Sequence, residues 1–142
     1  MSVTVKSIFL WQKEAENKVG LLARTLEPIA KAGADLGVVM GYRIPGSESK
    51  AVVEVYPVSG KKVIAAAAKA GLATSSIPTL LVEGDNRPGL AHRIAEIIAD
   101  TGADLRFFVA QAIGRRYSAV IGFATEDDAR KAAVLIKKAT GK

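Results

Sequence analysis

Two five-residue segments hold the residue types best suited to binding a small charged molecule. They are Asn17-Lys18-Val19-Gly20-Leu21 and Asn86-Arg87-Pro88-Gly89-Leu90. An asparagine side chain both donates and accepts hydrogen bonds, and a glycine lets a ligand approach the backbone closely. Where such a segment leads into a helix, the unpaired N–H groups of the first turn attract a carboxylate or a phosphate. Each segment is therefore a candidate anion-binding turn.

Acidic residues near these segments add the opposite charge to the candidate site. Glu16 and Asp85 precede the two asparagines, and Asp35 and Asp104 lie further along the chain. A carboxylate attracts an ammonium group, so an anion-binding turn beside it suits a zwitterion such as an amino acid. The alternative is purely structural, with the asparagine capping a helix and the glycine tightening the turn.

The chain lacks the parts of the common catalytic and metal sites. It has no cysteine and His92 is its only histidine, so Cys/His metal sets and His-based triads are incomplete. Neither a GxxxxGK nor a GxGxxG motif is present, which argues against nucleotide hydrolysis and dinucleotide binding. The sequence predicts a binding protein without catalytic residues, metal or cofactor, and His92 is expected at the surface.

The candidate turns belong to an internal repeat. Asn17 matches Asn86, and the stretch from Ala32 to Leu36 matches the stretch from Thr101 to Leu105 at the same separation, with no gap between the two matches. Self-similarity at a fixed separation indicates a duplicated structural unit.

The repeat also predicts where the two units divide. Ala51-Val52 matches Ala119-Val120 at a separation shorter by one position, which places a small length difference in the preceding hairpin. We expect a first unit over residues 1–72 and a second over 73–142, each too small to bury much core alone.

Each copy shows the hydrophobic patterns of the same series of elements. Apolar strands over Val3–Trp11 and Ile77–Glu83 lead into the turns, and spacings of four, seven and eight residues then predict an amphipathic helix. Residues Leu36–Ile44 alternate as in a half-buried strand, and a hairpin leads to another strand and a second helix. The order βαββα occurs twice, which predicts an α+β fold with antiparallel sheets and helices on one face.

At these residues the chain resembles the ACT domain. The resemblance is carried by Asp85 to Leu90, the helix that follows and the stretch from Thr101 to Leu105, and it extends over both copies. The ACT domain has a ferredoxin-like βαββαβ fold, binds amino acids and regulates amino-acid metabolism. Its ligand lies where two domains pair, between the strand–helix turn of one and the second strand of the other.

The resemblance implies an amino-acid site at each turn, with Asn86–Leu90 preferred because it matches the family better. Val19 stands where proline is usual in the family, and Asp35 and Asp104 stand where asparagine is often found before the second strand. The implied ligand-binding residues are Asn17, Lys18, Gly20, Leu21, Asp35, Asn86, Arg87, Pro88, Gly89, Leu90 and Asp104.

The repeat supplies one strand fewer than two complete units need. By the repeat Ile77–Val82 opens the second unit, yet the same strand is the only good candidate to close the first, unless the segment Leu72–Val82 serves both. After the last helix only Thr140-Gly141-Lys142 remains. Either one strand serves both units or another chain covers the open edge, since exposed sheet edges usually need cover. We therefore expect self-association, most simply a homodimer.

The net charge of +6 is spread along the chain. Residues up to Leu72 carry 10 basic and 6 acidic side chains and the rest carry 10 and 8, which favours solvated faces over a nucleic-acid site. No apolar run approaches the length of a membrane span. With no cysteine and no secretory signal at the start, a cytoplasmic location is expected.

The leading hypothesis is a regulatory protein that senses an amino acid at the interface of paired ACT-like units. One alternative keeps the fold as a protein-interaction module without a ligand, supported by the departures at Val19, Asp35 and Asp104. A second alternative, a nucleic-acid-binding protein, rests only on net charge and a sheet-based fold.

Overall fold

The computed structural model describes residues 3–140, which form two compact units. One unit comprises Phe9–Ser75, and the other combines the first strand of the chain with the segment from Ser76 onward. Each unit is a four-stranded antiparallel sheet with two helices, so the predicted α+β fold of two ferredoxin-like units is confirmed. No helix among residues 3–140 is long and apolar enough to cross a membrane.

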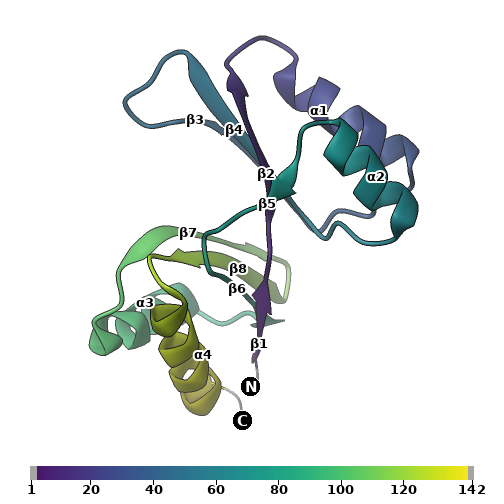
Figure 1. Ribbon diagram of the computed structural model, residues 1–142. Coiled ribbons are helices and arrows are strands. Elements are labelled where there is room, and N and C mark those ends of the chain that lie inside the picture. The colour runs from purple at the N-terminus through teal and green to yellow at the C-terminus, as the bar shows by residue number, and fades with distance from the viewer. Residues whose placement is uncertain (1–2, 141–142) are drawn as a thin grey trace. The chain divides into compact units, whose positions relative to one another are not determined.

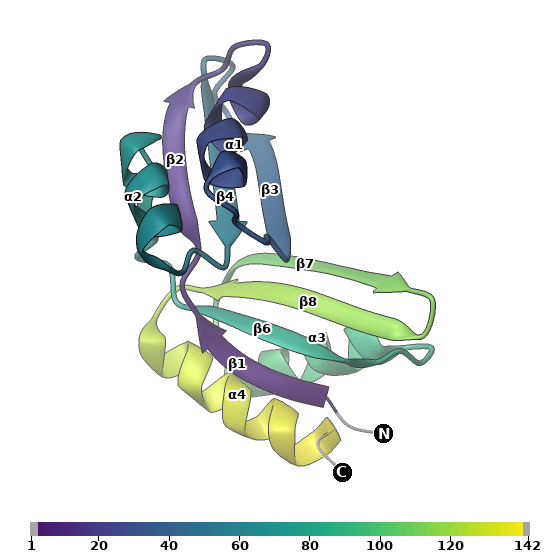
Figure 2. The ribbon, with the colours of Figure 1, turned by 90° about the vertical axis from the view of Figure 1, so that its right-hand side faces the viewer.

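The first unit follows the order βαββαβ. Its sheet has the strand order β3-β4-β2-β5, and α1 and α2 lie together on one face (Figure 2). The apolar residues of the helices and of the central strands form its core: Ile29, Val53, Val55, Ala67 and Leu72. Its elements are β2 (Trp11–Glu16), α1 (Leu21–Lys31), β3 (Val38–Arg43), β4 (Lys50–Tyr56), α2 (Lys61–Lys69) and β5 (Ala73–Thr74).

The second unit has the strand order β1-β6-β8-β7, with α3 and α4 packed against each other and against the sheet. Its core is larger and includes Ile94, Ile121, Phe123 and Ile136, all fully buried. Its elements are β1 (Val3–Ile8), β6 (Thr79–Asp85), α3 (Leu90–Thr101), β7 (Leu105–Ile113), β8 (Arg116–Phe123) and α4 (Glu126–Thr140).

The two units exchange their closing strands. β1 precedes β2 in the chain but pairs with β6, where Val3 lies opposite Gly84. β5 precedes β6 but pairs with β2, where Thr74 lies opposite Trp11. The purple N-terminal segment therefore runs out of one sheet as β1 and into the other as β2 (Figure 1).

This exchange explains how both sheets are completed although the sequence predicted one strand too few. The segment Leu72–Val82 is divided between β5 and β6 and is not one shared strand, and β1 closes the second unit. The structure therefore groups Val3–Ile8 with the later segment, which differs from the expected division at 1–72 and 73–142. The open edge from which we inferred self-association is covered by β1, so that inference loses its premise.

The strand registers also correct the alignment of the two hairpins. Ala15 lies opposite Ala51, and Gly84, the counterpart of Ala15 in the repeat, lies opposite Tyr117. Ala51 therefore corresponds to Tyr117, and the first hairpin is the longer of the two. The predicted match of Ala51 with Ala119 was wrong by two positions. An error of two positions leaves each side chain on the same face, so the hydrophobic pattern could not reveal it.

Candidate ligand-binding site

The turn between β2 and α1 leaves the start of the helix without a side-chain cap. Gly20 takes a left-handed conformation with φ 86°, and the Leu21 N–H donates to the Lys18 carbonyl at 3.1 Å. The first helical hydrogen bond comes from the Arg24 N–H to the Gly20 carbonyl at 3.0 Å. Between them, the N–H groups of Leu22 and Ala23 have no acceptor among the described residues, as is common at a helix start.

Asn17 fixes this turn to the β3–β4 hairpin and does not cap the helix. Its backbone N–H donates to the Ser49 carbonyl at 2.8 Å, and its side-chain Nδ2 lies 3.4 Å from the Glu48 carbonyl. The structural alternative of an asparagine cap is therefore wrong for this turn. The side-chain oxygen of Asn17 has no partner within residues 3–140 and can accept a hydrogen bond.

A cavity of about 500 Å³ lies between the start of α1 and strands β3 and β4. Lys18 and Arg43 are its charged lining residues, and none of the lining residues is acidic. The positive end of the α1 dipole adds to this charge, which favours a ligand with a carboxylate. The cavity is lined by Asn17, Lys18, Gly20, Leu21, Leu22, Ala23, Gly41, Tyr42, Arg43, Ala51, Val52 and Val53.

One lining residue, Tyr42, is held by a buried acid. Its hydroxyl donates to Oε1 of Glu54 at 2.8 Å, while Glu54 is fully buried and its Oε2 has no partner among the described residues. Burial raises the pKa of Glu54, and the hydrogen bond from Tyr42 offsets part of that rise. Burial and the same hydrogen bond raise the pKa of Tyr42 to about 12. Tyr42 therefore stays a neutral donor across the physiological pH range.

The second turn repeats the backbone geometry of the first. Gly89 has φ 82°, and the Leu90 N–H donates to the Arg87 carbonyl at 3.3 Å. The Asn86 N–H donates to the Arg115 carbonyl at 2.7 Å. The side chain of Leu90, however, is buried in the core, whereas Leu21 lines the cavity. The two turns share a backbone and differ in the space beside it.

The structure brings together part of the predicted site. Asn17, Lys18, Gly20 and Leu21 lie on one cavity, as expected for a binding turn. Asn86, Pro88 and Gly89 are exposed and Arg87 is half-buried. Asp35 and Asp104 are exposed residues just before β3 and β7, and Asp35 is not among the lining residues of the cavity.

The sequence did not identify the residues that line the cavity on the side opposite the turn. Arg43 of β3 lies opposite Ala51 of β4, and both line the cavity together with Gly41. The family resemblance pointed to the second strand in general terms, but neither a glycine nor an arginine there is distinctive. Only the pairing of β3 with β4 shows that these residues face the turn.

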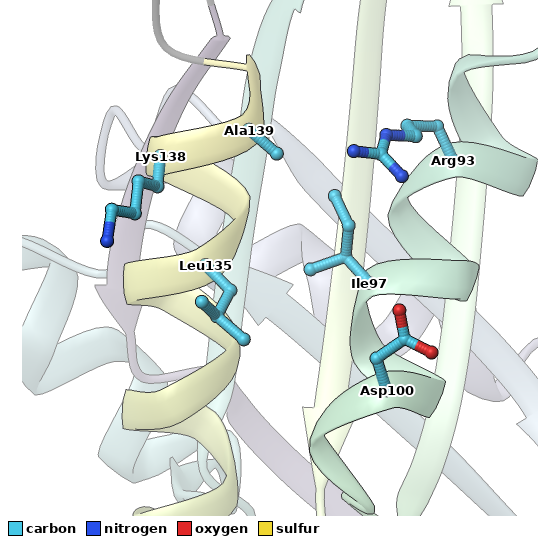
Figure 3. Close-up of a pocket in the computed structure, with 6 residues that line it drawn as sticks. All are labelled: Arg93, Ile97, Asp100, Leu135, Lys138 and Ala139. Atoms are coloured by element: carbon cyan, nitrogen blue, oxygen red, sulfur yellow. The ribbon is translucent and has the colours of Figure 1, made fainter.

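A second cavity, of about 280 Å³, lies between α3 and α4 of the other unit (Figure 3). Ile97 and Leu135 point toward each other across it, while Lys138 points away. Its lining runs along α3 from Arg93 to Asp100 and along the C-terminal half of α4. No group of histidine, aspartate and glutamate residues that could hold a metal occurs in the part of the chain that the structure describes.

Comparison with solved structures shows the fold. Protein BT0572 from Bacteroides thetaiotaomicron has a TM-score of 0.76 at 16% identity, covering 95% of this chain and 90% of that chain. The ligand-free regulatory subunit of aspartate kinase from Thermus thermophilus has a TM-score of 0.63 at 15% identity, covering 98% and 97%. Aspartate kinase from Clostridium acetobutylicum has a TM-score of 0.56 at 17% identity, covering 96% of this chain and 33% of that one.

These similarities confirm the resemblance to tandem ACT domains at the level of the fold. A scan of the sequence against family models gave no match, and a search of curated protein sequences gave none either. Because a fold hosts many functions, the function has to be argued from the cavity at the first turn.

Proposed function

We propose that this chain is a regulatory protein that binds an amino acid at the turn between β2 and α1. The observation that carries the proposal is the cavity of about 500 Å³ beside the unpaired N–H groups of Leu22 and Ala23. These two donors suit a carboxylate, and the side-chain oxygen of Asn17 suits an ammonium group. The resemblance to ACT domains supports an amino acid as the ligand.

The charge of the cavity narrows the ligand class. Lys18 and Arg43 are positive, and no acidic residue is among the lining. A ligand with more carboxylates than ammonium groups, such as L-aspartate or L-glutamate, gains from both side chains, whereas L-lysine meets charge of its own sign. We therefore propose an acidic amino acid as the preferred ligand.

Pairing of ACT-like units around the ligand, and a homodimer, are part of this proposal. The edge strands β3 and β7 support it, because each leaves large apolar side chains exposed, including Val39 and Ile113. Light scattering after size exclusion, with and without L-aspartate, measures the mass directly. A monomer under both conditions would remove pairing between chains from the proposal.

Thermal unfolding with each of the common amino acids tests the proposed binding. A ligand present at 100 times its Kd raises the free energy of unfolding by about 2.7 kcal/mol, which moves the melting temperature by several degrees. We expect acidic amino acids to give the largest increase. If none of the amino acids changes the melting temperature, the binding proposal fails and a protein-interaction module becomes the better explanation.

Arg43 offers a matched pair of variants. Arg43→Gln removes a charged lining residue, whereas Arg106→Gln makes the same change at an exposed arginine of β7. Hydrogen bonds to charged groups contribute about 1.5–3 kcal/mol, so Arg43→Gln should weaken L-aspartate binding by about 10- to 100-fold. Arg106→Gln should bind like the wild type. Equal effects of the two changes would place the ligand elsewhere.

A further inference from the structure

The two units differ at the position that forms the wall of the cavity. In the first unit, β4 places Ala51 opposite Ala15, and Ala51 lines the cavity. In the second unit, β8 places Tyr117 at the equivalent position, opposite Gly84. At this one position the first unit has alanine, with a single methyl group, and the second unit has tyrosine, one of the largest side chains.

Tyr117 lies inside the second unit beside the second turn. It is two residues beyond Arg115, whose carbonyl accepts the Asn86 N–H, just as Ala51 is two residues beyond Ser49 in the first unit. Only 5% of Tyr117 is exposed, and it belongs to the same core cluster as Leu90. Its ring therefore lies where the first unit leaves a cavity.

A second difference between the units also reduces the space beside the second turn. Gly41 lines the first cavity from β3, where it lies opposite Val53. The equivalent residue of the second unit is Ala110 of β7, which lies opposite Ala119 and packs against the core. Both replacements add side-chain volume on the helix side of the second sheet.

The hydroxyl of Tyr117 indicates that this residue contributes through the packing of its ring and not through a hydrogen bond. The oxygen is buried and has no hydrogen-bond partner among the described residues. Burial without a partner is unfavourable for a hydroxyl and raises the pKa of Tyr117. A residue that keeps an unpaired polar atom in the core contributes through the space that it fills.

We propose that Tyr117 occupies the ligand position of the second unit, so that each chain binds one amino acid, in the first unit only. This inference rests on the proposed function for its ligand, while the filling of the second turn by Tyr117 can be tested without one. It reverses the preference that the sequence motif indicated, since the turn with the better match is the closed one.

Calorimetric titration with L-aspartate tests the stoichiometry. We expect one L-aspartate per chain for the wild type, none for Ala51→Tyr and two for Tyr117→Ala. Tyr117→Phe is the matched control, because it keeps the ring and should still bind one. Two sites in the wild type, wild-type binding by Ala51→Tyr, or one site in a folded Tyr117→Ala variant would overturn the proposal.

Binding of p-cresol, the side-chain analogue of tyrosine, separates this proposal from the proposed function. We expect p-cresol to raise the melting temperature of Tyr117→Ala by several degrees and to shift the backbone N–H resonances of Asn86–Leu90, with no effect on the wild type. If Tyr117→Ala does not fold, Tyr117→Leu replaces it. A folded variant in which p-cresol leaves those resonances unchanged would overturn the filling of the turn, whatever L-aspartate does.

Discussion

Removal of the Tyr42 hydroxyl should destabilise the protein in a pH-dependent way. In Tyr42→Phe, both oxygens of the fully buried Glu54 carboxyl lack a partner among the described residues. A hydrogen bond between neutral groups contributes about 1 kcal/mol, and one to a charged group about 1.5–3 kcal/mol. We therefore expect a loss of about 1 kcal/mol at low pH, where Glu54 is protonated, and about 2–3 kcal/mol where it is ionised.

The sign of the pH dependence follows from the raised pKa of Glu54. An acid whose pKa is higher in the folded than in the unfolded state stabilises the fold below the unfolded pKa. That contribution is lost as the pH rises through the folded pKa. Because the hydrogen bond from Tyr42 lowers the pKa of Glu54, Tyr42→Phe raises it further and extends the loss to higher pH.

Urea unfolding at about pH 4 and pH 8 measures this difference. Tyr56→Phe is the control, since it makes the same chemical change on β4 at a hydroxyl without a hydrogen bond among the described residues. In a Glu54→Gln background, the effect of Tyr42→Phe should become independent of pH. An equal loss at both pH values in the wild-type background would refute the reasoning.

Three further predictions concern stability and ionisation. Gly122→Ala should cost about 2–3 kcal/mol in urea unfolding, because the new Cβ would lie 2.3 Å from Cε2 of the Phe107 ring, and adding Phe107→Ala should cost less than the sum of the two changes. Gly20→Ala should cost about 1–2 kcal/mol, because φ is 86° and the Cβ would lie 2.8 Å from Nη1 of Arg24; a change below about 0.5 kcal/mol would contradict this turn geometry. Ultraviolet titration of Tyr42→Phe against the wild type should assign a phenol with a pKa of about 12 to Tyr42, and a phenol lost near pH 10 would contradict its contact with Glu54.

The elements of the fold could be predicted because each depends on a local pattern. The alternation from Leu36 to Ile44 predicted the strand that the structure shows as β3. His92 is exposed on α3, as expected.

The exchange of closing strands could not be predicted, because no local signal selects a partner sheet. Val3–Ile8 continues almost directly into β2, so the pattern indicated one strand over Val3–Trp11, whereas the chain changes sheets near Phe9. β5 is only two residues long, which leaves almost no pattern to recognise. Pairing between segments distant in sequence is decided by packing of the whole unit.

The difference between the two turns was hidden for a related reason. The motif residues are similar, and the residue that separates the units lies on a neighbouring strand. The match of Ala51 with Ala119 misplaced Tyr117 by two positions. The sequence therefore did not show that Tyr117 lies beside the second turn. Register across a hairpin of changed length comes from the strand pairing and not from residue identity.

The central claim is that the first turn binds the carboxylate of an amino acid. Backbone N–H resonances measured during titration with L-aspartate test it most directly, since each turn reports separately. The account predicts large shifts at Leu22 and Ala23, whose N–H groups lie beside the cavity, and small shifts at the equivalent Ala91 and His92. Shifts confined to Ala91 and His92, or none at either turn, would contradict it.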